Sequence, residues 1–170
     1  GFQLWANLPS DHKMMDPRYR EVKNSEIPEV KQTNGAQIRV ICGTVGKVSG
    51  PVRDIVTDPE YLDITVPPGS EFAHPTRKGH TVLAYVAEGS GHFGRGAEGE
   101  AADAETLVAF SDGLQVKVST GDQSLRFLLV SGKPIGEPVA WYGPIVMNTK
   151  AELDVAFEEY ENGTFIKHKR

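Results

Sequence analysis

The chain has 170 residues, enough for one domain of ordinary size, with or without a short additional segment, and too few for two full domains. Its 18 basic and 23 acidic side chains give a formal net charge of −5, which argues against general nucleic-acid binding because that function normally brings a basic excess. No apolar run approaches the ~20 residues that a membrane-spanning helix needs. The single cysteine excludes an internal disulfide, and with no recognisable signal peptide we expect a cytoplasmic protein, or a nuclear one in a eukaryote.

The first nine residues predict a β-strand. Phe2, Leu4 and Ala6 alternate with more polar positions from the second residue onward, with no initiator Met and no polar lead-in. We therefore expect residues 1–9 to be a strand left from a preceding domain, so that the chain is a fragment. A tag remnant or a processed amino terminus is the alternative, although such ends are usually polar and disordered.

Residues 10–34 have the composition of a linker or surface segment. Charged side chains dominate, and Pro17 and Pro28 interrupt any helix.

Short β-branched runs follow residue 35 at even spacing, with glycine and proline turns between them and no helical pattern. This arrangement is typical of an all-β antiparallel sandwich or barrel. If Glu88-Gly89 is a two-residue hairpin turn, His92 pairs with Tyr85. The predicted strands are residues 38–42, 61–66, 81–87, 106–110, 114–119, 125–130 and 139–142.

One helix is predicted near the carboxy terminus. Thr149 and Glu152 form a capping box, apolar residues follow at helical spacing, and Asn162-Gly163 supplies the stop, giving a helix of roughly three turns. The basic residues 167–170 after it favour a solvated tail over a binding patch.

The histidines require a test for metal binding, because His74, His80 and His92 lie close together in the chain. A jelly-roll barrel of the cupin kind holds a metal through a His-x-His pair, a nearby acidic residue and a later histidine. Here Thr76 stands at the second histidine position, nothing acidic follows before Glu88, and strands 114–119 and 125–130 contain no histidine. We therefore predict no metal ligand in this chain.

Other chemistries find no support in the sequence. It contains no Gly-x-Ser-x-Gly elbow, no phosphate-binding loop and no Cys-x-x-Cys pair. The glycine-rich stretch 91–99 runs into acidic residues that would repel phosphate, so we expect a flexible hairpin or loop. Cys42 lies in a strand-like run and is predicted to be a buried, inert thiol. We expect no catalytic and no cofactor-binding residue.

Two stretches resemble a known family, the pirin family of bicupins. They are Gln3-Leu4-Trp5-Ala6-Asn7-Leu8 and Gly143-Pro144-Ile145-Val146-Met147-Asn148-Thr149. The resemblance implies a cupin or jelly-roll antiparallel β-barrel with one carboxy-terminal helix, with the barrel at residues 35–147 and the helix and tail at 148–170. In that family the first stretch lies near the middle of a chain about twice as long, so the sequence resembles a carboxy-terminal half.

The resemblance also implies a function. The family binds iron through three histidines and a glutamate of its amino-terminal barrel, all of which would precede Gly1. Where that barrel has His-Pro-His-Arg-Gly, this chain has His74-Pro75-Thr76-Arg77-Lys78-Gly79, which keeps one ligand type in one alignment and none in the other. The chain would be the non-catalytic cupin domain of an iron-dependent protein that resembles quercetin 2,3-dioxygenase. The alternative is a redox-responsive regulator that binds a transcription-factor complex or a metabolic enzyme.

The implied partners follow from the same reasoning. The first partner is the missing amino-terminal cupin half, and a protein partner follows under the regulatory alternative. A lone half would leave Phe2, Leu4 and Trp5 exposed, so we predict an interface there and a homo-oligomer that uses residues 1–8. We expect no direct contact with nucleic acid or membrane.

Overall fold

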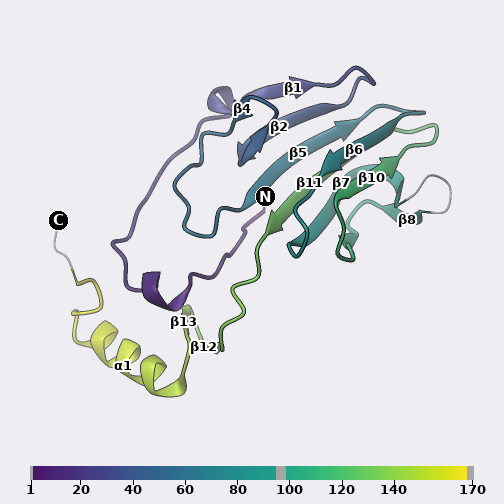
Figure 1. The fold of residues 1–170 in the computed structure, drawn as a ribbon. Helices are drawn as coiled ribbons and strands as arrows, with labels where there is room; N and C mark the ends of the chain where they lie inside the picture. The colour runs from purple at the N-terminus through teal and green to yellow at the C-terminus, as the bar shows by residue number, and fades with distance from the viewer. Residues whose placement is uncertain (1, 95–98, 168–170) are drawn as a thin grey trace. The chain divides into compact units, whose positions relative to one another are not determined.

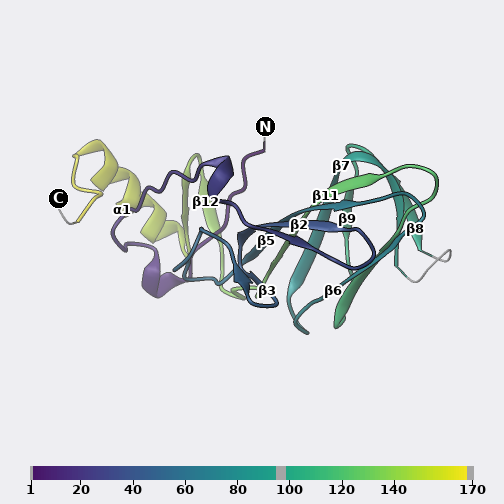
Figure 2. The same cartoon turned by 90° about the horizontal axis from the view of Figure 1, so that it is seen from above.

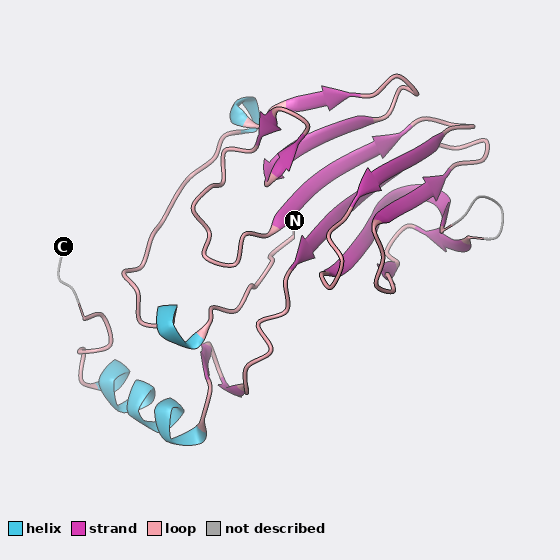
Figure 3. Ribbon diagram, in the orientation of Figure 1, coloured by secondary structure: helices cyan, strands magenta, loops and turns pink. Residues whose placement is uncertain are grey.

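The computed structural model describes residues 2–94 and 99–167. The chain divides into two compact units. The first, here called the barrel unit, comprises Val22–Pro134, and the second, the terminal unit, combines Gly1–Glu21 with Ile135–Arg170. Figure 3 shows strands throughout the barrel unit and the long helix in the terminal unit. Each unit is described by itself below.

The barrel unit is an antiparallel sheet that curls on itself (Figures 1 and 2). Its strands run in the order β1-β2-β5-β11-β7-β10-β6, with β8 and β9 also paired to β7 and with a separate β3–β4 hairpin. A 3-10 turn, η2 (Asn24–Glu26), precedes the sheet. The strands are β1 (Glu29–Lys31), β2 (Gln37–Cys42), β3 (Thr44–Val45), β4 (Val48–Ser49), β5 (Glu60–Val66), β6 (Glu71–Pro75), β7 (Thr81–Phe93), β8 (Glu100–Asp103), β9 (Leu107–Ala109), β10 (Gln115–Ser119) and β11 (Leu125–Gly132).

Strand β7 bends at Gly89 and so belongs to both halves of the curled sheet. Its first part pairs with β11 and β9, and its last residues pair with β8 and β10. Gly89 has a φ of 75°, and a Cβ there would lie 1.9 Å from the Ser124 carbonyl oxygen, so this close approach requires glycine. Close to this bend, the register of the β7–β11 pair shifts between Arg126 and Phe127, as in a β-bulge.

The predicted hairpin turn at Glu88-Gly89 is therefore wrong. The strand continues through these residues, and His92 pairs with Ala101 of β8 and Ser119 of β10 instead of with Tyr85. Gly89 does not reverse the chain; it allows the backbone to pass close to Ser124. The Glu88-Gly89 pair in the sequence does not reveal this role.

Alternating side chains fill the interior of the barrel unit. Strand β2 shows the strict in–out burial pattern, and β11 follows it over eight residues. At the centre, Phe127 meets the rings of Phe72 and Phe93 edge to face, with centroids 6.0 and 5.5 Å apart. The predicted all-β antiparallel architecture with one carboxy-terminal helix is confirmed.

A row of charges crosses the outer face of the same sheet. Asp63 of β5 accepts two hydrogen bonds of 2.9 Å from the Arg126 guanidinium of β11, and Arg39 of β2 lies 3.6 Å away. Arg126 also donates to Glu88 of β7 at 2.8 Å. The hydrogen bond to Asp63 is the main cause that raises the pKa of Arg126 above its ordinary value. Four strands are thus joined by side chains as well as by the backbone ladder.

The terminal unit contains η1 (Ser10–His12), a hairpin of β12 (Ala140–Tyr142) and β13 (Ile145–Met147), and helix α1 (Lys150–Glu161). The predicted capping box is confirmed: Thr149 Oγ1 accepts from the Glu152 amide at 3.2 Å, and Glu152 Oε2 accepts from the Thr149 amide at 2.8 Å. The helix ends at Glu161, Asn162 is its C-cap, and Gly163 adopts the left-handed conformation.

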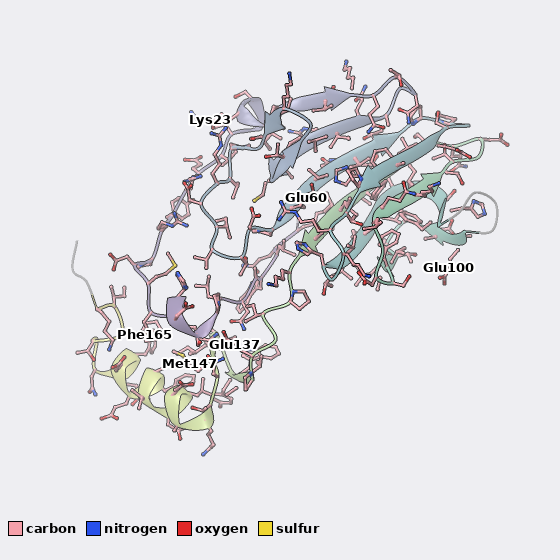
Figure 4. All side chains as sticks on the ribbon, in the orientation of Figure 1. Lys23, Glu60, Glu100, Glu137, Met147 and Phe165 are labelled. Atoms are coloured by element: carbon pink, nitrogen blue, oxygen red, sulfur yellow. The ribbon has the colours of Figure 1, made fainter. Side chains whose placement is uncertain are left out.

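Two chain segments meet in the terminal unit at Glu137. Its Oε2 accepts from the Ser10 amide at 2.9 Å and from the Asn148 side chain at 2.8 Å (Figure 4). The small core of this unit consists of Ile145, Met147, Leu153 and Ala156.

The division of the chain differs from the predicted one. Residues 2–9 lie outside the strands of the described chain. Residues 10–34 hold η1, η2 and β1 rather than a plain linker. Residues 139–147, expected in the barrel, form the β12–β13 hairpin of the terminal unit, because Gly143 turns the chain back on itself. In the described residues, no helix has the length and apolar character to cross a membrane.

Candidate functional site

The histidine motif region lies at one end of the barrel unit, where β6 ends and β5 begins. His74 of β6 is buried, and its Nε2 lies 3.0 Å from Glu60 Oε2 of β5. Glu60 is labelled in Figure 4. The His74 side chain is 4% exposed and the Glu60 side chain 19%. Strands β11, β7 and β10 separate β5 from β6 in the sheet order, so this pair joins two strands that are not neighbours in the sheet.

These residues do not fit the iron that the resemblance implies for the longer family members. An iron site of the cupin kind needs several histidine and carboxylate donors that point at one ion. Here His74 and Glu60 bind each other, Thr76 donates to the Gly113 carbonyl, and Arg77 donates to Asp58. Among residues 2–94 and 99–167, no three His, Cys, Asp or Glu side chains are grouped so that they could hold a metal ion.

Cys42 lies beside this pair at the end of β2. Its thiol is buried and donates to the Pro59 carbonyl at 3.2 Å. Burial is the main cause that raises the pKa of the thiol, the backbone hydrogen bond with Gly43 opposes the rise, and the nearby carboxylates of Asp58 and Glu60 add to it. The prediction of a buried thiol is confirmed, and a raised pKa is typical of an unreactive cysteine.

The remaining predicted histidines lie apart from this end of the barrel. His80 is half-buried in the turn before β7, and His92 is exposed near the other end of that strand. Residues 95–98 of the glycine-rich stretch and residues 168–170 of the basic tail lie outside the described residues.

The terminal unit carries an apolar groove of about 930 Å³. Most of its lining residues are apolar, and several aromatic ones are exposed to solvent, among them Trp5, Trp141 and Tyr160. Met147 and Phe165, also in the lining, appear in Figure 4 near helix α1. The lining residues are Trp5, Ala6, Asn7, Leu8, Lys13, Val139, Trp141, Pro144, Ile145, Val146, Met147, Phe157, Tyr160 and Phe165.

The groove is held by local contacts. Trp141 Nε1 donates to the Gly143 carbonyl at 2.7 Å, and the rings of Tyr142 and Phe157 meet edge to face at 5.5 Å. Lys13 Nζ donates to Asn7 Oδ1 at 2.8 Å, which anchors the segment that carries Trp5. Such a surface can bind an apolar partner surface through burial of aromatic rings.

The groove includes only part of the interface that was predicted from the sequence. Of Phe2, Leu4 and Trp5, all exposed, only Trp5 is a lining residue of the groove. Sequence reasoning missed that Val139, Phe157 and Phe165 also line the groove. The two stretches that resemble the pirin family could have located the groove, because both lie in the terminal unit and contribute lining residues.

Comparison with known proteins gives consistent matches over nearly the whole chain. Pirin-1 of Arabidopsis thaliana is 42% identical over 165 residues, which cover 95% of this chain and 56% of that protein. Pirin-like protein 2 of the same plant is 38% identical, over 96% of this chain and 52% of its own length. A crystal structure of quercetin 2,3-dioxygenase from Acinetobacter baumannii superposes with a TM-score of 0.83 at 29% identity, covering 95% of this chain and 55% of that one.

The chain therefore spans little more than half the length of these relatives. The superposition confirms the cupin-like fold predicted from the sequence. A family model described as the pirin C-terminal cupin domain matches residues 61–166, which is more than half of the chain. On this match and these relatives, the chain belongs to the pirin family.

Proposed function

We propose that the chain serves as the non-catalytic cupin domain of a longer pirin, in which a preceding half carries the iron and the chemistry. The observation that carries this proposal is the hydrogen bond between His74 Nε2 and Glu60 Oε2. It commits the one buried histidine of the described residues to a carboxylate partner, in an interior filled mainly by Phe72, Phe93, Phe127 and aliphatic side chains.

The activity proposed for the longer protein is the oxygen-dependent opening of a flavonol ring. It rests on the crystal structure named quercetin 2,3-dioxygenase that this chain resembles. In that protein the present domain would support the iron barrel and would touch neither substrate nor oxygen.

The terminal unit would supply the surface that meets the preceding half. Its groove exposes aromatic rings, including Trp141 and Trp5, beyond what its own small core can bury. The relatives are almost twice as long as the matched region, and the matching family model describes a C-terminal domain, so a preceding half is the partner we propose. In the absence of that half, a second copy of this chain would cover the same surface through residues 1–8.

A second candidate function, a redox-responsive interaction protein, is favoured by the same exposed groove. Oxygen uptake with quercetin separates the two candidates. For the enzyme, the longer protein consumes oxygen with quercetin and the present chain does not. For the interaction protein, neither does, and the longer protein captures a partner instead.

Elemental analysis tests the proposed role of the domain. We expect no stoichiometric iron in the purified chain after incubation with ferrous ion. About one iron per chain, lost in His74→Ala, would overturn the proposal. Light scattering tests the surface: the chain should be dimeric or larger, and deletion of residues 1–9 or Trp141→Ser should return it to a monomer. A wild-type chain that is already monomeric contradicts the predicted self-association.

A further inference from the structure

Three consecutive residues at the entrance to β5 are each held by a side chain from elsewhere in the barrel unit. Asp58 Oδ2 accepts from Arg77 at 3.0 Å, the Pro59 carbonyl accepts from the Cys42 thiol at 3.2 Å, and Glu60 pairs with His74 at 3.0 Å. The segment that leads to them, residues 51–59, contains no regular helix or strand and is here called the strap.

The strap is attached at its other end too. The Val52 amide donates to the Ile41 carbonyl at 3.1 Å, and Val52 forms an isolated bridge with Cys42. Cys42 is therefore contacted from both ends of the strap, by the Val52 backbone and by the Pro59 carbonyl. These contacts account for the burial of a thiol that lies at the end of a strand.

The three attachments near β5 are unequal. Asp58 and Arg77 are 75% and 71% exposed, and an ion pair so exposed contributes little. The His74–Glu60 bond is largely shielded from water and is correspondingly harder to replace by hydration. A Cβ on Gly43 would lie 3.1–3.3 Å from Glu60, so the β2 backbone packs directly on this residue and leaves it little room to shift.

The strap also has a reason to open. Asp54 and Asp58 adopt positive φ values of 59° and 42°, a conformation that L-residues rarely occupy. A segment with strained backbone and no ladder of its own belongs to the part of a fold that opens locally before the core unfolds.

We propose that the strap is a movable cover over Cys42 and that the His74–Glu60 bond, at the first residue of β5 directly after the strap, anchors the end of the cover. His74 acts as a positioning residue for the cover, and release of the strap exposes the thiol while the barrel remains folded. The proposal goes beyond the proposed function and does not depend on it. It assigns His74 a conformational role in place of metal binding.

Native-state thiol labelling tests the cover directly, because Cys42 is the single cysteine of the chain. The full chain is treated with a maleimide, and the labelling rate is measured at increasing urea below the unfolding transition. We expect His74→Leu to raise the rate about tenfold, the factor expected for loss of one net hydrogen bond, with almost no dependence on low urea concentrations.

Val118→Ala is the matched control, since Val118 is buried in the core and pairs with Phe72 of β6 and Phe93 of β7. It should raise labelling only through global unfolding, with the full dependence on urea. Arg77→Gln should change the rate less than His74→Leu. If His74→Leu labels no faster than Val118→Ala at equal global stability, the proposal is wrong.

Hydrogen exchange on the wild-type chain keeps the proposal testable if His74→Leu fails to fold. The Val52 and Asp58 amides, which donate to Ile41 and Ile55, should exchange by local opening well before the amides of Leu62 and Ile64. Exchange of all four amides only with global unfolding would overturn the proposal.

Discussion

The barrel unit and the terminal unit bury their apolar side chains to very different extents. In the barrel unit Phe127 is fully buried among other aromatic rings, whereas in the terminal unit Trp141 is 69% exposed. A curled sheet can enclose its own inner face, but a single helix on a two-stranded hairpin has too little surface to cover its aromatic residues. The comparison explains why the proposed docking surface lies on the terminal unit.

The chain carries a separate natural probe for each unit. Both tryptophans of the sequence, Trp5 and Trp141, belong to the terminal unit, and the single cysteine, Cys42, belongs to the barrel unit. Tryptophan fluorescence therefore reports on the terminal unit, and thiol protection reports on the barrel unit. The predictions below use this separation.

The largest effect is expected from truncation in the barrel core. Phe127→Ala should lower the free energy of unfolding by about 3–5 kcal/mol, because it removes a buried ring and leaves a cavity between Phe72 and Phe93. Cys42 labelling at urea concentrations near the unfolding transition, where global unfolding controls the rate, measures this loss. Trp141→Ala is the control and should cost far less in the same measurement. Equal losses in the two variants would contradict the contrast between the units.

A smaller effect is expected from the charge row on the outer face of the sheet. Asp63→Ala should cost about 2–3 kcal/mol, because it removes a buried carboxylate that receives two hydrogen bonds from Arg126. The matched variant is Asp154→Ala, which breaks the exposed Lys150–Asp154 pair of α1 at 3.7 Å and should cost no more than about 0.5 kcal/mol. Denaturation midpoints that shift equally in both variants would show that the burial of Asp63 does not matter.

The terminal unit should respond to loss of its helix cap. Thr149→Ala should cost about 1 kcal/mol, since the Glu152 amide loses its hydrogen-bond acceptor at the start of α1. The loss should appear in tryptophan fluorescence and leave Cys42 labelling unchanged. Thr149→Ser keeps the acceptor and is the control. A fluorescence transition identical in Thr149→Ala and the wild type would place the helix start elsewhere.

The smallest effect is a dependence on pH in the same cap. The pKa of Glu152 lies below its ordinary value. The main cause is hydrogen bonding with the Thr149 side chain, and hydrogen bonding with the Thr149 backbone amide is the next. A carboxyl group whose pKa is lower in the folded state stabilises the fold above its ordinary pKa, and the contribution is lost as the pH falls through the lowered, folded-state pKa. We expect the fluorescence transition of the terminal unit to weaken on acidification over that range. Glu152→Gln should flatten this dependence. A dependence that survives in Glu152→Gln would have to come from another group.

Much of the strand pattern could be predicted from the sequence. The predicted strands 38–42, 61–66 and 125–130 correspond to β2, β5 and β11, because their alternation of apolar and polar side chains is the pattern of one buried face. Strand β6 escaped prediction although it carries His74, since Glu71–Pro75 contains only Phe72 as a large apolar residue and ends in proline. Strands β3 and β4 are too short to show a period.

The candidate site was less accessible to sequence reasoning. The sequence predicted no iron site around His74, because Thr76 stands where a second histidine would be needed. That His74 pairs with Glu60 could not be foreseen, since the two strands are four positions apart in the sheet and their side chains meet only when the sheet curls.

The sequence by itself determined the all-β class of this protein, most of its strands, its single capped helix and its family. Each of these depends on residues close together in the chain, where periodicity, turn chemistry and capping act over a few positions. The tertiary structure alone decided that β7 bends at Gly89 instead of turning, that residues 139–147 leave the barrel, and that His74 meets Glu60. These features depend on crowding and hydrogen bonding between segments far apart in the sequence, and such contacts exist only once the chain has folded.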